Sequence, residues 1–84
     1  MTVALYVLDV PEFEPLVRAA RTAGMEVRGS GDYLELTAGG DEVLLRREGT
    51  GIRTALWHAA LTGGLDARIV SFTSDIIHLT GEGQ

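Results

Sequence analysis

The chain has 84 residues and a formal net charge of −5, because 12 acidic side chains outnumber 7 basic ones. That length favours a single domain, and an acidic chain has a weak electrostatic footprint for nucleic acid or an anionic membrane surface. The sequence has no cysteine, which excludes disulfides, thiolate metal ligands and cysteine nucleophiles and fits a cytoplasmic protein. Hydrophobic residues make up 45% of the chain, which is enough to predict a folded core rather than disorder.

The first two predicted elements are a strand and a helix. Residues 2–8 form a nearly continuous apolar run, which is typical of a buried strand and is too short for a signal peptide or a membrane span. The next segment has apolar residues at the spacing of one helix face: Phe13, Leu16, Val17 and Ala20. Pro11 and Pro15 are compatible with the start of this helix, and Gly24 is its expected end.

The rest of the chain predicts five more strands and a second helix. The second helix is expected over about 50–62, where the pair Gly63-Gly64 would end it. Runs rich in apolar and β-branched residues, separated by turn residues, predict the strands over 25–29, 32–37, 42–48, 66–72 and 75–80.

The element order β-α-β-β-β-α-β-β indicates two copies of a βαββ unit. They would span residues 1–40 and 41–80 of a single domain over 1–84, with a frayed tail at 81–84. AARTAG aligns with AALTGG, and DYLELT aligns with DIIHLT, although such short matches also arise by chance. We therefore predict an α+β fold in which a six-stranded, mainly antiparallel sheet carries both helices on one face.

The second helix carries the only tryptophan of the chain. Helical spacing predicts that its core side consists of Ile52, Ala55, Leu56, Ala59 and Gly63. Trp57 would then lie on the flank of the helix near Arg53, with His58 further round. On that flank, Trp57 could contact the first helix, a neighbouring subunit or a stacked ligand.

Alternation along the strands predicts one sheet face against the helices and one open face. Leu34, Leu36, Ile77 and Leu79 would face the helices. The open face would carry Tyr6, Tyr33, Glu35, Leu44, Arg46, Arg68, Val70, Phe72, Ile76 and His78, and a bulge would flip the positions in 44–46 and 68–72. Such an apolar face indicates a binding surface, for which the interface candidates are Tyr33, Trp57, Phe72 and Ile76.

The sequence predicts no catalytic residue, because it has no nucleophile, phosphate-loop or dinucleotide motif. The only candidates for acid–base chemistry are Glu35, His58 and His78. Glu35 and His78 are equivalent in the two copies, so they could form a proton-transfer pair; a cross-strand polar pair without chemistry is the alternative. No metal-ligand spacing is present, and neither a metal nor another cofactor is predicted.

The stretch REGTGIR, residues 47–53, is the strongest small-ligand candidate in the sequence. Backbone N–H groups at the start of a helix, together with nearby arginines, could hold a phosphate or a carboxylate. The ligand-binding candidates there are Thr50, Arg53 and Trp57. Ordinary N-capping of the helix by Thr50 is the structural alternative.

These features predict a small cytoplasmic assembly module that forms a homodimer, or binds a partner protein, through the open sheet face or the flank of Trp57. The alternative is a protein that binds a small anionic ligand, or a minor enzyme, with the anion near Thr50 and Arg53. The acidic charge disfavours nucleic acid as a partner, and no membrane association is expected.

Overall fold

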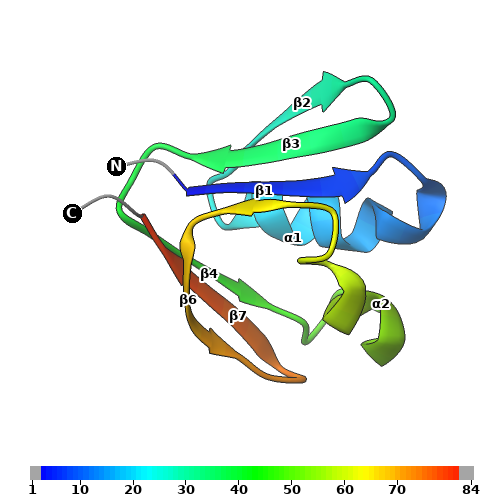
Figure 1. The fold of residues 1–84 in the computed structure, drawn as a ribbon. Coiled ribbons are helices and arrows are strands. Elements are labelled where there is room, and N and C mark those ends of the chain that lie inside the picture. Colours follow the sequence, from blue (N-terminus) through cyan, green and yellow to red (C-terminus); the bar gives the residue numbers. More distant parts are fainter. Residues whose placement is uncertain (1–2, 82–84) are drawn as a thin grey trace.

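The strands form two antiparallel sheets in the computed structural model, which describes residues 3–81 (Figure 1). The four-stranded sheet has the order β2 (Glu26–Ser30), β3 (Tyr33–Ala38), β1 (Val3–Leu8) and β5 (Leu65–Asp66). The three-stranded sheet has the order β4 (Glu42–Arg46), β7 (Ile76–Thr80) and β6 (Arg68–Phe72). The predicted α+β class and antiparallel pairing are confirmed, whereas the single six-stranded sheet is wrong.

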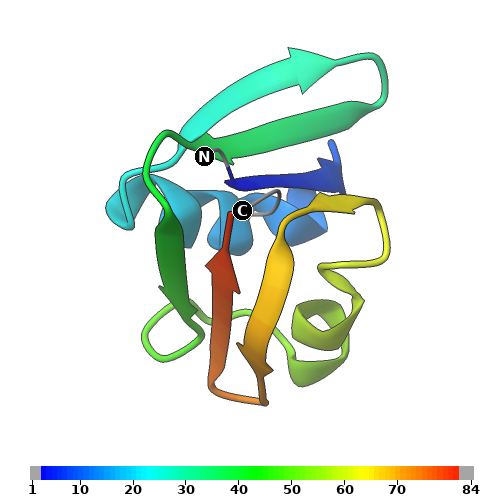
Figure 2. The same cartoon turned by 60° about the vertical axis from the view of Figure 1, so that its left-hand side comes forward.

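The chain passes from one sheet to the other within the strand predicted over 66–72. β5 pairs with β1, placing Leu65 opposite Leu5, whereas β6 pairs with β7. The residue between them, Ala67, is buried. A strand that bends from one sheet into another forms the corner of two packed sheets. This corner is why the single strand predicted over 66–72 contributes to both sheets (Figure 2).

The first helix follows its predicted face. A 3-10 turn, η1 (Pro11–Phe13), leads into α1 (Glu14–Thr22), and the prolines lie at the starts of these two helices, where they cost no helical hydrogen bond. Gly24, at φ +93°, follows the helix as expected. The residues that the spacing assigned to the core are all buried: Phe13, Leu16, Val17 and Ala20.

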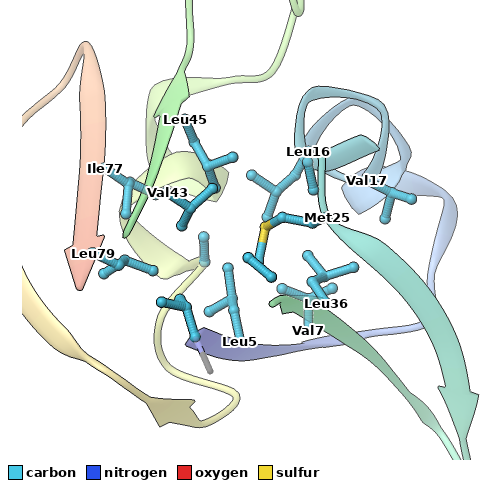
Figure 3. Packing of buried hydrophobic residues seen from close by; sticks show 14 of the residues in the cluster. Leu5, Val7, Leu16, Val17, Met25, Leu36, Val43, Leu45, Ile77 and Leu79 are labelled. Carbon is cyan, nitrogen blue, oxygen red and sulfur yellow. The ribbon is translucent and has the colours of Figure 1, made fainter. Parts of the chain in front are cut away.

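The core lies between the two sheets and α1 (Figure 3). Alternate residues of β1 point into it, and Leu5 and Val7 are at most 1% exposed. Of the residues predicted to face inwards, Leu36, Ile77 and Leu79 are fully buried, and Leu34 is partly buried against the same cluster. Strand alternation was therefore sufficient to predict the inner faces of β3 and β7.

The two halves of the chain share one strand order. The third strand of each half lies in the middle, giving β2-β3-β1 in one sheet and β6-β7-β4 in the other. The helices are held by different elements, since α1 contacts β2 and β4 whereas α2 (Thr54–Ala59) is bonded to the β6–β7 turn. Of the predicted frayed tail, Gly81 donates its N–H to the Asp41 carbonyl at 2.8 Å, and 82–84 lie outside the described residues.

No helix within residues 3–81 combines the length and the apolar character needed to cross a membrane.

Candidate functional site

Trp57 lies in the core and not on the helix flank. Its side chain is fully buried, and its indole N–H donates to the Thr73 carbonyl at 2.7 Å. A buried indole N–H needs such an acceptor. The predicted core side of this helix is wrong, because the prediction assumed a helix from about residue 50 whereas α2 begins only at Thr54, after an extended Arg53. Within this segment, Ala55 is exposed and Ala60 is buried. Trp57 therefore anchors α2 to the β6–β7 turn and offers no surface to a second molecule.

Arg47 fixes the loop before α2 to the same turn. Its Nε donates to the Ser74 carbonyl and its Nη1 donates to the Ile52 carbonyl, at 2.5 and 3.3 Å. Its backbone N–H donates to the Asp75 carbonyl at 2.9 Å. This arginine is therefore occupied by the protein itself. No sequence pattern indicates that role, since all three acceptors are backbone carbonyls.

Thr50 stabilises this loop rather than the helix. Its hydroxyl donates to the Arg47 carbonyl at 2.6 Å and accepts the Ile52 N–H at 3.2 Å. Gly49 and Gly51, on either side, have φ values of +81° and +75°, which favour glycine. The N-capping alternative for Thr50 is therefore wrong. Of the three predicted ligand residues, Thr50 is part of the loop, Arg53 is exposed and Trp57 is buried, so no common site results.

His58 lies on the exposed side of α2. Its ring contacts the Phe72 ring, with centroids 5.5 Å apart, and its Nε2 lies 3.4 Å from the Ser74 hydroxyl oxygen. That distance is at the long end of the range for a hydrogen bond. Phe72 itself lies on the core side of β6, opposite Ile77, because a bulge between Ile69 and Ser71 reverses the alternation. Its predicted place on the open face is wrong for that reason.

Glu35 and His78 do not form the predicted pair. Glu35 accepts a hydrogen bond from the Tyr6 hydroxyl at 3.1 Å, on the outer face of the four-stranded sheet. This hydrogen bond, burial and the charges of Glu35 and Asp66 raise the pKa of Tyr6 above its usual 10.0. His78 lies in the other sheet, where its Nε2 contacts the Glu42 carboxylate. Each is a polar pair with a residue of a neighbouring strand, so the alternative, a cross-strand polar pair of Glu35 with His78, is not found either.

The three-stranded sheet exposes apolar side chains on its edge strand. Ile69 and Val70 of β6 are 50% and 55% exposed, the largest values among the exposed large apolar residues. Ile76, on the outer face of the neighbouring β7, is half-buried. Ile69 lies opposite Leu79, whereas Ile76 lies at the other end of β7 beside the β6–β7 turn, so we call Ile69 and Val70 alone the β6 patch. Tyr33, the remaining interface candidate, is 37% exposed on the other sheet and is not part of it.

Sequence comparisons with protein-family models and with curated proteins find no match. Among residues 3–81, no group of three or more histidine and carboxylate side chains is placed to hold a metal ion. The candidate surface is therefore defined by exposure alone. Sequence reasoning missed Ile69, because alternation assigns it to the inner face and only the edge position of β6 exposes it.

Proposed function

We propose that this protein is a small cytoplasmic assembly module that forms a homodimer through the β6 patch. The observation that carries the proposal is the exposure of Ile69 and Val70, each at least half accessible, on a strand that within residues 3–81 pairs with β7 alone. Exposed apolar patches on small proteins generally mark interaction surfaces. The lack of cysteine fits a reducing compartment. No reaction is part of this proposal.

The contact between the two copies would rest on side chains rather than on a continuous sheet. The bulge between Ile69 and Ser71 interrupts the regular ladder of β6, and Arg68 precedes the patch. Bulges and charges of this kind disfavour strand-to-strand pairing at sheet edges. A twofold axis near Val70 would instead bring the two patches face to face, as in the self-complementary interfaces of homodimers.

The exposed area predicts a weak dimer. Completing the burial of a half-exposed aliphatic side chain contributes about 1 kcal/mol, so Ile69 and Val70 of both copies contribute about 4 kcal/mol. Ordering of the partners consumes part of this gain. We therefore expect a dissociation constant of about 1 mM or weaker, since 1 mM corresponds to about 4 kcal/mol.

The proposal includes the predicted duplication of a βαββ unit. It is supported by the strand order that the two halves share, with the third strand in the middle of each sheet. It is also supported by the alignment of Glu35 with His78, which lie at corresponding places in β3 and β7. A unit that already packs against its own copy within one chain gives a simple origin for an assembly module.

Light scattering or sedimentation from micromolar to millimolar concentration tests the proposal. We expect the mass of the native protein to rise from one chain towards two, and Val70→Lys to remain monomeric throughout. The matched control is Leu8→Lys, which places the same charge on a 43% exposed leucine of the other sheet and should leave dimerisation intact. A native protein that stays monomeric at millimolar concentration overturns the proposal. A Val70→Lys variant that still dimerises removes β6 from the contact.

A further inference from the structure

A second surface feature lies on the other side of the three-stranded sheet, where α1 approaches β4 (Figure 2). A groove of about 550 Å³ runs between them and ends at the turn that contains Glu48 and Thr50. This volume lies within the range of small-molecule sites, about 300–1,000 Å³. Its apolar lining consists of Pro15, Ala19, Ala23 and Leu44, of which Leu44 is 37% exposed.

Two arginines line this groove, one from each wall. Arg18 comes from α1 and Arg46 comes from β4. Neither guanidinium has a hydrogen bond or an ion pair to any residue between 3 and 81, in contrast to Arg47, whose guanidinium is used by two carbonyls. Two cations that share a groove without a partner repel each other, whereas an anion bound between them would be attracted to both.

We propose that this groove binds a small organic acid, with its carboxylate between Arg18 and Arg46 and its apolar stem over Ala19 and Leu44. Guanidinium groups pair with carboxylates through two parallel hydrogen bonds, which gives orientation as well as affinity. The apolar lining selects a hydrocarbon stem over a bare ion. This site differs from the predicted one at Thr50, Arg53 and Trp57 and does not depend on dimerisation through the β6 patch.

Glu48 limits the charge that the groove accepts. Its carboxylate lines the same groove as the two arginines, leaving a net charge of about one positive unit for the ligand. That favours a monocarboxylate over a phosphate, which carries nearly two negative charges at neutral pH. Replacement of Glu48 by glutamine should therefore tighten the binding of a carboxylate severalfold.

Amide chemical-shift titrations with three probes test the site. Hexanoate carries both charge and stem, acetate carries the charge alone, and 1-hexanol carries the stem alone. We expect saturable shifts along the groove for hexanoate, with acetate and 1-hexanol at least about tenfold weaker, a difference of 1.4 kcal/mol. Arg18→Gln and Arg46→Gln should each weaken hexanoate about tenfold, since each removes a charged hydrogen-bond partner.

Arg21→Gln is the matched control, because Arg21 belongs to the same helix but does not line the groove. It should leave hexanoate binding within about twofold. Absence of saturable shifts with hexanoate overturns the proposal, as does equal binding of 1-hexanol or of acetate. If Arg21→Gln and Arg18→Gln weakened hexanoate binding equally, the binding would reflect general electrostatic attraction and the proposed site would also be overturned. Arg18 and Arg46 are exposed, so retained amide spectra will show that the variants are folded.

Discussion

The two outer edge strands, β2 and β6, occupy the same place in the order of their sheets but expose different side chains. β2 ends its sheet with Glu26, Arg28 and Ser30 facing outwards, and its Val27 packs against the core. β6 ends its sheet with Ile69 and Val70 at least half exposed. Natural sheet edges are protected by charge and polarity. β2 follows that rule with charged and polar side chains, whereas β6 has a bulge and Arg68 but exposes two large apolar side chains, and this contrast motivates the assembly proposal.

The other edges of the sheets differ as well. β1 is covered by β5, a short strand that the second half of the chain contributes to the first sheet. No strand within residues 3–81 covers β4 in return, and the groove lined by Arg18 and Arg46 lies beside it. The two halves thus share a strand order, but β5 covers the edge of β1 whereas the corresponding edge of β4 is uncovered within residues 3–81. Both proposals place a ligand or a second copy where the three-stranded sheet is uncovered.

The largest expected effect comes from removing the side chain that holds α2 to the β6–β7 turn. Trp57→Ala should lower the free energy of unfolding by about 3–5 kcal/mol, because a fully buried aromatic side chain leaves a cavity. The adjacent His58→Ala should cost less than about 1.5 kcal/mol, since only a ring contact with Phe72 is lost. Denaturant unfolding of both variants measures the difference. Equal losses would mean that the indole does not hold α2 to the β6–β7 turn.

A second substitution, Gly63→Ala, is expected to expose the edge of β1 that β5 covers. A Cβ at Gly63 would lie 2.3 Å from the Tyr6 carbonyl oxygen, so Gly63→Ala must displace β5 from β1. We expect a loss of about 1–3 kcal/mol in unfolding free energy and faster exchange of the Tyr6 amide, which donates to the Gly64 carbonyl. Gly40→Ala, which meets no atom within 4 Å, is the control and should not destabilise. Unchanged Tyr6 exchange would contradict this account.

The contrast between the two edge strands can be measured with one substitution in each. Val27→Lys should lower the unfolding free energy by about 1–2 kcal/mol, because Val27 is partly buried against the core. Val70→Lys should change it by no more than about 0.5 kcal/mol, because Val70 is 55% exposed. Dilute samples are needed, so that dimerisation does not contribute. A large loss in Val70→Lys would show that β6 is part of the monomer core.

The smallest effect concerns the polar outer face of the four-stranded sheet. The Glu35 carboxylate, which accepts the Tyr6 hydroxyl, raises the pKa of Tyr6, so the folded state holds this proton more tightly than the unfolded chain does. The resulting stabilisation is complete below about pH 10 and is lost as the pH rises through the folded pKa. Tyr6→Phe should therefore flatten the alkaline fall in stability.

Tyr33→Phe is the control for that change. Between residues 3 and 81 the Tyr33 hydroxyl has no hydrogen-bond partner, although the side chain lies on the same sheet face. Unfolding curves at several alkaline pH values should separate the two variants. If Tyr6→Phe and the native protein lost stability equally at alkaline pH, the Tyr6–Glu35 hydrogen bond would not contribute to the stability of this sheet.

Much of the candidate surface could not be predicted from the sequence. The open face was expected to carry Val70 and Ile76 together with Phe72, and the bulge in β6 moved Phe72 to the core side. Bulges leave little trace in a sequence, because one extra residue shifts the alternation without changing composition. Arg18 and Arg46, which line the groove, are 28 positions apart and carried no shared local signal.

Local patterns in the sequence were enough to predict several buried elements. The burial of β1 follows from its nearly continuous apolar run. The apolar face of α1 and the inward residues of β3 and β7 follow from spacing, since a helix or strand repeats its faces at fixed intervals. The corner at Ala67, the burial of Trp57 and the exposure of Ile69 became known from the three-dimensional structure. Those three depend on which distant segment lies beside each residue, and periodicity contains no information about that.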